Sequence, residues 1–314
     1  MKKIVFTLLL TLFAVVIRAQ ESQTEYNFLR LPVSAHAAAL GGENITIIED
    51  DPSLMFSNPA LASSVSDKTV GLSYMNYMRG AHYMGASYTK ALGEKATLAG
   101  GVRYMNYGKM KEVDANNVQT GTFNASEIAV EGIFSYELAR NLVGGITAKF
   151  ITSYIGSYNS MAVGVDLGLN WYEPERQWSV SLVAKNLGGQ IKAYEEEYGK
   201  MPIDVQVGVS KTFAALPVRV SATLVDLTHY DYRFINHLNL GAEVLLSESI
   251  WVGGGYNFRK ADEMTIGTAD NASAHGAGFS VGAGINLEQF KLNLAYGKYH
   301  AASNSILVNL AYSF

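Results

Sequence analysis

Large apolar residues recur at every second position through most of the chain. In MAVGVDLGLNW, residues 161–171, methionine, valine, leucine and tryptophan alternate with alanine, glycine, aspartate and asparagine. The stretches IDVQVGVSKTF at 203–213, FSVGAGI at 279–285 and FKLNLAY at 290–296 repeat this alternation. A period of two residues predicts a β-strand with one apolar face and one small or polar face.

About fourteen such segments follow one another from residue 69 to the end of the chain. The alternation is weakest near residues 82 and 96, where glycine, alanine and tyrosine dominate. We expect strands near 69–78, 82–91, 96–108, 123–137, 142–153, 160–172, 177–187, 202–213, 217–227, 236–247, 250–258, 276–286, 289–298 and 305–314.

Short and long connections alternate between these predicted strands. LGEK, LARN, EPER, AALP, SES and NLEQ follow even-numbered strands, whereas the longer stretches 109–122, 188–201, 228–235 and 259–275 follow odd-numbered ones. Short periplasmic turns opposite long surface loops are typical of outer-membrane barrels. A closed sheet also avoids unpaired backbone groups, each of which costs several kcal/mol in hydrocarbon. We therefore predict an all-β fold over residues 68–314, a transmembrane antiparallel β-barrel of about 14 strands. A soluble β-sandwich is the alternative.

The beginning of the chain has the pattern of a secretory signal peptide. Two lysines precede an apolar run from Ile4 to Ile17, and small residues follow around Ala19. The run is too short to span a membrane as a helix. We expect residues 1–19 to be cleaved off and the mature chain to be integral to the outer membrane; an uncleaved anchor is the alternative.

Composition agrees with an exported membrane barrel. Charged residues make up 17% of the chain, below the roughly 25% of soluble domains, although 48% of residues are hydrophobic. The absence of cysteine excludes a lipoprotein anchor, disulfides and cysteine metal sites. The net charge of −4 gives no sign of nucleic-acid binding.

The chain ends in ILVNLAYSF, an alternating stretch with an aromatic last residue. Such an ending resembles the signal that outer-membrane proteins present to the barrel assembly machinery. We expect Leu310, Tyr312 and Phe314 to carry it. A simple lipid-facing edge is the alternative, and the two interpretations are compatible.

Residues 20–67 do not alternate and read as short helices and turns. We expect a turn at Asn58, Pro59 and Ala60, with the asparagine side chain bonded to nearby backbone. Fourteen strands enclose a lumen wider than the packed interior of an eight-stranded barrel. The segment is therefore predicted to fold into that lumen as a hatch or plug.

Three stretches carry a family resemblance: LPVSAHAAALGG, DDPSLMFSNPAL and, at 183–189, VAKNLGG. Together they look like the FadL-like PorV/PorQ barrels of the type IX secretion system in Bacteroidetes, and more closely like the PorQ branch. The resemblance is specific only in the N-terminal segment. It implies a hatch inside a fourteen-stranded barrel that docks the surface protein PorZ. It also implies a complex with the sortase-like protease PorU and with PorV, which joins cargo to lipopolysaccharide.

Catalytic motifs are absent from the sequence. The histidines form no HxxxH pair, and there is no GxSxG and no P-loop. Five polar residues, Glu131, Asp166, Asn170, His237 and Glu243, fall on the inward phase of their strands. A polar lumen bonded to the hatch explains them better than an acid–base site does. We predict no enzyme, no cofactor and no metal.

Two acidic stretches have competing interpretations. Glu49-Asp50-Asp51 lacks the spaced ligand set of a calcium site and is better read as an anchoring or solvated turn. The run Tyr194, Glu195, Glu196, Glu197 and Tyr198 lies in a predicted surface loop. It is either simply solvated or a partner contact, because aromatic residues beside charge suit an interface rim.

Two functions remain open at this point. The first is a non-enzymatic barrel whose surface loops dock PorZ. The second is a FadL-like transporter of hydrophobic small molecules, which would need an apolar pocket beside the hatch and a lateral opening in a strand. A glycine kink or a bulge in the second or third strand could supply that opening. An outer-membrane hydrolase using His237 is a third and weaker alternative.

Overall fold

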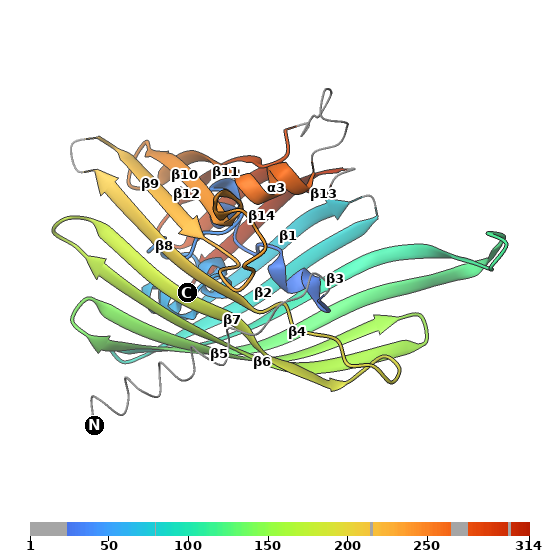
Figure 1. The fold of residues 1–314 in the computed structure, drawn as a ribbon. Helices are drawn as coiled ribbons and strands as arrows, with labels where there is room; N and C mark the ends of the chain where they lie inside the picture. The colour runs from blue at the N-terminus through green and yellow to red at the C-terminus, as the bar shows by residue number, and fades with distance from the viewer. Residues whose placement is uncertain (1–23, 79, 214–215, 265–275, 301–302) are drawn as a thin grey trace.

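The computed structural model describes residues 24–78, 80–213, 216–264, 276–300 and 303–314. Within them, fourteen antiparallel strands form one closed barrel, in which each strand pairs with its neighbours in sequence and β1 pairs with β14 (Figure 1). The predicted all-β barrel is confirmed, including the number of strands.

The strands have the following bounds: β1 Thr69–Met78, β2 Ala81–Leu92, β3 Ala96–Val113, β4 Gln119–Ala139, β5 Leu142–Ile155, β6 Tyr158–Glu173, β7 Trp178–Lys192, β8 Asp204–Phe213, β9 Val218–Leu224, β10 Leu238–Leu245, β11 Ile250–Asn257, β12 Phe279–Asn286, β13 Phe290–His300 and β14 Ser303–Ser313.

The two end strands close the barrel in a continuous register. Thr69 lies opposite Ser313, and the pairing runs without a shift to Asn76 opposite Ile306. On β14 the side chains of Leu310 and Tyr312 are exposed on the outer face, whereas Asn309 is buried on the inner face. The period of two residues thus separates an apolar outer surface from a polar interior.

The predicted loop at 109–122 is wrong. Strands β3 and β4 continue through this stretch and pair with each other as far as Val113 opposite Gln119. Figure 1 shows this pair extending as an arm beyond the other strands. Charged and polar residues hid the strand pattern here, because a two-stranded ribbon in water has no buried face to enforce alternation.

The irregularity expected in the second or third strand is present in β3, whose pairing with β4 shifts between Asn106 and Lys109. Strands β2 and β3 pair without a shift from His82 opposite Asn106 to Leu92 opposite Ala96. A further bulge occurs between β6 and β7, where the register shifts between Val165 and Leu167.

Residues 24–67 fold into short helices. They are η1 Asn27–Arg30, α2 Ala35–Ala39, η2 Pro52–Phe56 and η3 Pro59–Ser64. Helix α2 contacts β11 to β14, η2 contacts β1 and β2, and η3 contacts β3 to β6. Side chains such as Ile45, Leu54 and Met55 are almost fully buried. This N-terminal segment therefore packs against the inner face of the barrel wall and supplies much of the hydrophobic core.

Two further helices, η4 Phe234–His237 and α3 Phe258–Glu263, lie in the connections after β9 and β11. None of the helices among the described residues is both long and apolar enough to cross a membrane. The predicted signal peptide, residues 1–19, and His275 lie outside the described residues.

Candidate functional site

Charged side chains of the N-terminal segment pair with charged groups of the barrel around much of its circumference. Five residues of the segment take part, and their partners belong to β7, β9, β10, β13 and the connection after β9. The pairs are Arg30 with Asp226, His36 with Glu243, Glu43 with Lys185, Glu49 with Arg219, and Asp50 with Lys291. The segment is thereby held electrostatically on several sides.

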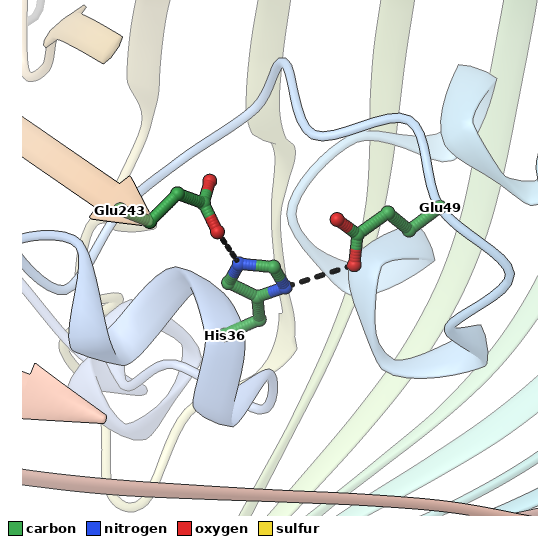
Figure 2. Close-up of side chains that lie close together, drawn as sticks. All are labelled: His36, Glu49 and Glu243. Carbon is green, nitrogen blue, oxygen red and sulfur yellow. Dashed lines mark hydrogen bonds and ion pairs between the residues drawn. The ribbon is translucent and has the colours of Figure 1, made fainter. Parts of the chain in front are cut away.

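The most buried of these contacts centres on His36 in α2, a helix whose N-cap Ser34 accepts a hydrogen bond from Ala37 N–H. Nε2 of His36 lies 2.6 Å from an oxygen of Glu243, and Nδ1 lies 3.0 Å from an oxygen of Glu49. Figure 2 shows the imidazole between the two carboxylates. The ring also stacks on Trp251 with 3.7 Å between the ring centroids.

Arg219 completes the cluster from β9. Its Nε lies 2.5 Å from the second oxygen of Glu243, and its Nη2 contacts the second oxygen of Glu49. Burial alone would lower the pKa of His36, but the two carboxylates overcome this and raise the pKa to about 9. Burial alone would raise the pKa of Glu49, but His36 and Arg219 reverse the direction and lower it. Two cations thus balance two anions in a buried network.

The ligand atoms of His36, Glu49 and Glu243 lie within 4.8 Å of one another, which is close enough for all three to reach one metal ion. The arrangement does not suit a metal. Each ring nitrogen already faces a carboxylate, and a protonated imidazole has no free lone pair. Arg219 occupies the remaining carboxylate oxygens. The cluster is therefore an ion-pair network that joins the N-terminal segment to β9 and β10.

The acidic step Glu49-Asp50-Asp51 has three separate roles. Glu49 belongs to the His36 cluster, and Asp50 lies 2.5 Å from Nζ of Lys291. Asp51 caps η2 by accepting a hydrogen bond from Ser53 N–H at 2.8 Å. Burial raises the pKa of Asp51. The three carboxylates point to different partners, which is an anchoring arrangement and not a calcium site.

Glycines of the wall allow the N-terminal segment to approach the strand backbone closely. A Cβ atom added to Gly145 would lie 2.3 Å from the carbonyl carbon of Pro59. One added to Gly255 would lie 2.2 Å from backbone atoms of Leu40 and Gly41. Real Cβ atoms do not approach other atoms this closely, so a side chain at either position would displace the segment.

The residues Asn58, Pro59 and Ala60 form the turn that opens η3. Oδ1 of Asn58 accepts a hydrogen bond from Ala60 N–H at 3.0 Å. Nδ2 of Asn58 donates to the carbonyl of Ile45 at 3.0 Å and to Ser181 Oγ at 3.3 Å. Pro59 stands at the first helical position, where it needs no N–H partner. The turn links two parts of the segment to each other and to β7.

The VAKNLGG stretch coincides with the bulge in β7. Asn186 has a φ of 59°, in the left-handed region that asparagine tolerates better than most residues. Its N–H donates to Asp166 at 2.7 Å, and its side chain accepts from Lys149 at 2.7 Å and donates to the carbonyl of Pro202 at 2.9 Å. Lys149 in turn lies 2.7 Å from Asp166. These buried bonds compensate for the ladder interrupted by the bulge.

The other polar residues predicted to point inward each have a partner of their own, although His237 is the last residue of η4 and not, as predicted, part of a strand. Glu131 pairs with Arg103 at 2.5 Å. Nη1 of Arg103 also donates to the carbonyl of Leu29. Asn170 donates to Ser179 at 2.8 Å, and Nδ1 of His237 faces the carbonyl of Val225 at 2.8 Å. Within the described part of the chain, none of these contacts pairs a nucleophilic side chain with a general base.

The run Tyr194–Tyr198 follows β7 at the end of the barrel from which the β3–β4 arm extends. Tyr194 Oη donates to Ser153 at 2.5 Å, and the three glutamates are exposed. An open groove of about 820 Å³ is lined by Ile155, Tyr158 and residues 194–197. This surface combines aromatic, apolar and acidic groups.

Comparison with protein families gives one match. The family described as type IX secretion system membrane protein PorP/SprF matches residues 63–308. The chain belongs to the PorP/SprF family. The expected type IX secretion system is thereby confirmed at the level of this family, whose members are described as membrane proteins of that system. No curated protein matches the chain.

Solved structures place this PorP/SprF-family barrel among FadL-like folds. The toluene transporter TbuX of Ralstonia pickettii shares 13% identity and a TM-score of 0.56, over 90% of this chain and 96% of its own. The toluene transporter TodX of Pseudomonas putida shares 12% identity and a TM-score of 0.55, over 90% of this chain and 97% of its own. A FadL homologue of Pseudomonas aeruginosa shares 10% identity and a TM-score of 0.55, over 90% of this chain and 98% of its own. At these identities the likeness shows the fold alone.

Sequence reasoning did not single out His36 or Arg219. Their partners lie far away in sequence, with 207 positions between His36 and Glu243. A histidine inside the alanine-rich run of the N-terminal segment was the available signal, since such a run favours burial and a buried histidine needs partners.

Proposed function

We propose that this chain is a non-enzymatic, PorQ-like docking barrel of the type IX secretion system. In this proposal it holds PorZ at the cell surface within the cargo attachment complex that includes PorU and PorV. The observation that carries the proposal is the lumen: a buried N-terminal segment packs against the wall and engages its charged side chains. A barrel filled in this way offers its surface, and not its interior, for function.

The N-terminal segment, residues 20–67, is proposed to act as a permanent hatch. Its ion pairs involve several different strands, and Asn58, Pro59 and Ala60 fix its second half against β7. Breaking one buried pair typically costs 3–5 kcal/mol, because the remaining charge is left uncompensated. A segment held by several such pairs has a high barrier to leaving the lumen.

The surface run Tyr194, Glu195, Glu196, Glu197 and Tyr198 is proposed as part of the partner-binding surface. Tyr198 is 66% exposed and Tyr158 across the groove is 50% exposed. Exposed aromatic residues beside unpaired charge are common at protein interfaces. The outer face of the barrel contacts the lipid bilayer and, on the outside of the cell, lipopolysaccharide.

The two ends of the chain are proposed to direct its biogenesis. Residues 1–19 would be a cleaved signal peptide that leads to export. At the other end, Leu310 and Tyr312 are exposed on the outer face, and Tyr312 meets Phe314 edge-on at 5.0 Å. This aromatic edge is available for recognition by the assembly machinery before β14 pairs with β1.

A gene deletion tests the proposed function. In a strain that lacks this gene, PorZ should leave the cell surface and appear in the medium, and secreted cargo should lose its attachment. Complementation with the intact gene should restore both. PorZ that stays on the surface of the deletion strain contradicts the proposal.

A transporter of hydrophobic small molecules is the second candidate. It is favoured by the likeness to proteins described as toluene transporters, together with a groove on the outer face beside the bulge. This groove has a volume of about 720 Å³, and its lining includes Leu187, Val205 and Leu227. Uptake of labelled toluene into liposomes that hold the purified barrel, above the rate of empty liposomes, would support this candidate.

The hydrolase alternative predicts a measurable activity that depends on His237. Because Nδ1 of His237 faces a backbone carbonyl, we expect no such activity. His237→Ala should leave lipase and protease assays at background, as for the parent barrel.

A further inference from the structure

The β3–β4 ribbon, defined here as residues 107–113 and 119–124, extends past both neighbouring strands. Pairing of β3 with β2 ends at Asn106, and pairing of β4 with β5 ends at Ala125. Strands β3 and β4 contain 18 and 21 residues, whereas a tilted strand crosses a membrane in about 9–11. The extra length therefore serves something outside the membrane.

Both edges of the ribbon are unpaired among the described residues, except for one backbone hydrogen bond at Asn124. Gly156 N–H donates to the carbonyl of Asn124 at 2.9 Å, so the backbone groups of Asn124 point to the β5 side. Backbone groups alternate in direction along a strand, and those of Thr122 therefore point to the same free edge. Lys111 lies opposite Thr122, and its backbone groups point to the other free edge, on the β2 side.

The tip of the ribbon is held in shape by its own hydrogen bonds. Asp114 N–H donates to the carbonyl of Val118 at 3.0 Å, and Oδ1 of Asp114 accepts from the N–H groups of Asn116 and Val118 at 2.9 Å. A two-stranded ribbon alone is marginally stable in water. Because these hydrogen bonds already hold the ribbon in shape, the ribbon loses less conformational entropy when a third strand binds to it.

The β4 edge begins beside the acidic groove. Ile155, which lines the groove, is the pairing partner of Ala125, which is two residues away from Phe123, where the free edge starts. Across the groove, Glu195, Glu196 and Glu197 are exposed, and the ion pairs of the described residues give them no basic partner.

We propose that the free edge of β4, Gln119–Phe123, binds an extended β-strand of a partner protein by adding it to the ribbon. The strand carries lysine or arginine residues at the end that reaches the groove, where they meet Glu195, Glu196 and Glu197. Backbone hydrogen bonds give the affinity and the glutamates give the polarity of the strand. This inference rests on the proposed docking function and assigns the contact that performs it.

Two proline variants test the proposal as a matched pair. Thr122→Pro removes an N–H from the β4 edge, and Lys111→Pro removes one from the β2-side edge. Neither N–H belongs to the ladder within the ribbon, so both variants should keep the ribbon and the barrel. Folding is checked by the shift between heated and unheated samples on a detergent gel. The probe is purified PorZ, and its dissociation constant is measured with the barrel in nanodiscs.

We expect Thr122→Pro to weaken PorZ binding at least tenfold and Lys111→Pro to change it less than twofold. Changing Glu195, Glu196 and Glu197 together to glutamine should weaken binding and reduce its salt dependence. Hydrogen exchange in the parent complex should slow in residues 119–123.

Equal binding by Thr122→Pro and the parent, without slowed exchange in 119–123, overturns this inference and leaves the docking function standing. Weakening by Lys111→Pro alone places the contact on the other edge and also overturns it. If the parent barrel itself does not bind PorZ, the docking function fails, and this inference fails with it.

Discussion

Gly145 and Gly132 differ in what a methyl group would meet, although they lie on adjacent strands. At Gly145 a Cβ would clash with the backbone of Pro59 and Ala60, whereas at Gly132 nothing lies within 4 Å. Gly145→Ala should therefore destabilise the folded barrel by about 1–3 kcal/mol through overpacking. Gly132→Ala should change stability by less than about 0.5 kcal/mol. Urea unfolding in detergent, followed by tryptophan fluorescence, compares the two; equal midpoints would contradict the close approach.

His36 makes the anchoring of the N-terminal segment depend on pH. Its pKa is raised from 6.5 to about 9, so its stabilisation is complete below pH 6.5 and is lost as the pH rises to about 9. Glu49 acts in the opposite direction: its pKa is lowered, so its stabilisation is present above its ordinary pKa and is lost only in acid.

The parent should therefore lose stability between pH 6.5 and 9, by roughly 3 kcal/mol if the shift is fully expressed. His36→Gln should be less stable than the parent at pH 6 and should lack this pH dependence. Urea midpoints at several pH values measure both. A parent midpoint that is flat from pH 6.5 to 9 would rule out a protonated His36 in the cluster.

The bulge in β7 depends on a single residue, so one substitution there should have a large effect on stability. Both Asn186→Gly and Asn186→Ala lose the side-chain bonds to Lys149 and Pro202. Only alanine adds the cost of the left-handed backbone, which is about 1–2 kcal/mol. We expect both variants to unfold at lower urea than the parent, with alanine the less stable of the two. The reverse order would show that the bulge relaxes its backbone.

The strands of the barrel wall were predictable from sequence, whereas the β3–β4 ribbon was not. Where one face meets lipid and the other the N-terminal segment, the sequence must alternate, as it does from Met161 to Trp171. The ribbon at 107–124 has water on both faces and needs no alternation. The bulge expected in the second or third strand occurs in β3, but the bulge at Asn186 was not predicted, because its cause is a buried network with Asp166 that no local sequence pattern indicates.

At the scale of the whole molecule, sequence indicated a segment suited to the lumen but not how it is held. The inward residues Glu131, Asp166 and Glu243 were identified as polar lumen groups, and they are buried. Their partners could not be paired from sequence, because the contacts join positions far apart on a closed surface. Knowing the register of the strands and the path of residues 24–67 is necessary to see that Glu243 faces His36.

The account as a whole holds that the N-terminal segment stays in place while the surface docks a partner. A covalent lock can separate docking from movement of this segment, since the chain has no cysteine of its own. A Cβ at Gly71 would lie 3.5 Å from Cβ of Pro52 in η2, within the span of a disulfide at roughly 3.5–4.5 Å. It would also lie 2.6 Å from Oγ of Ser87, so that hydroxyl has to rotate away. Pro52→Cys with Gly71→Cys would therefore tie η2 to β1.

The most direct measurement is the dissociation constant of PorZ for this doubly substituted barrel in nanodiscs, oxidised and then reduced. The account predicts binding in both states with constants that agree within about twofold. Binding that appears only after reduction, or no binding in either state, would contradict a docking barrel with a fixed hatch.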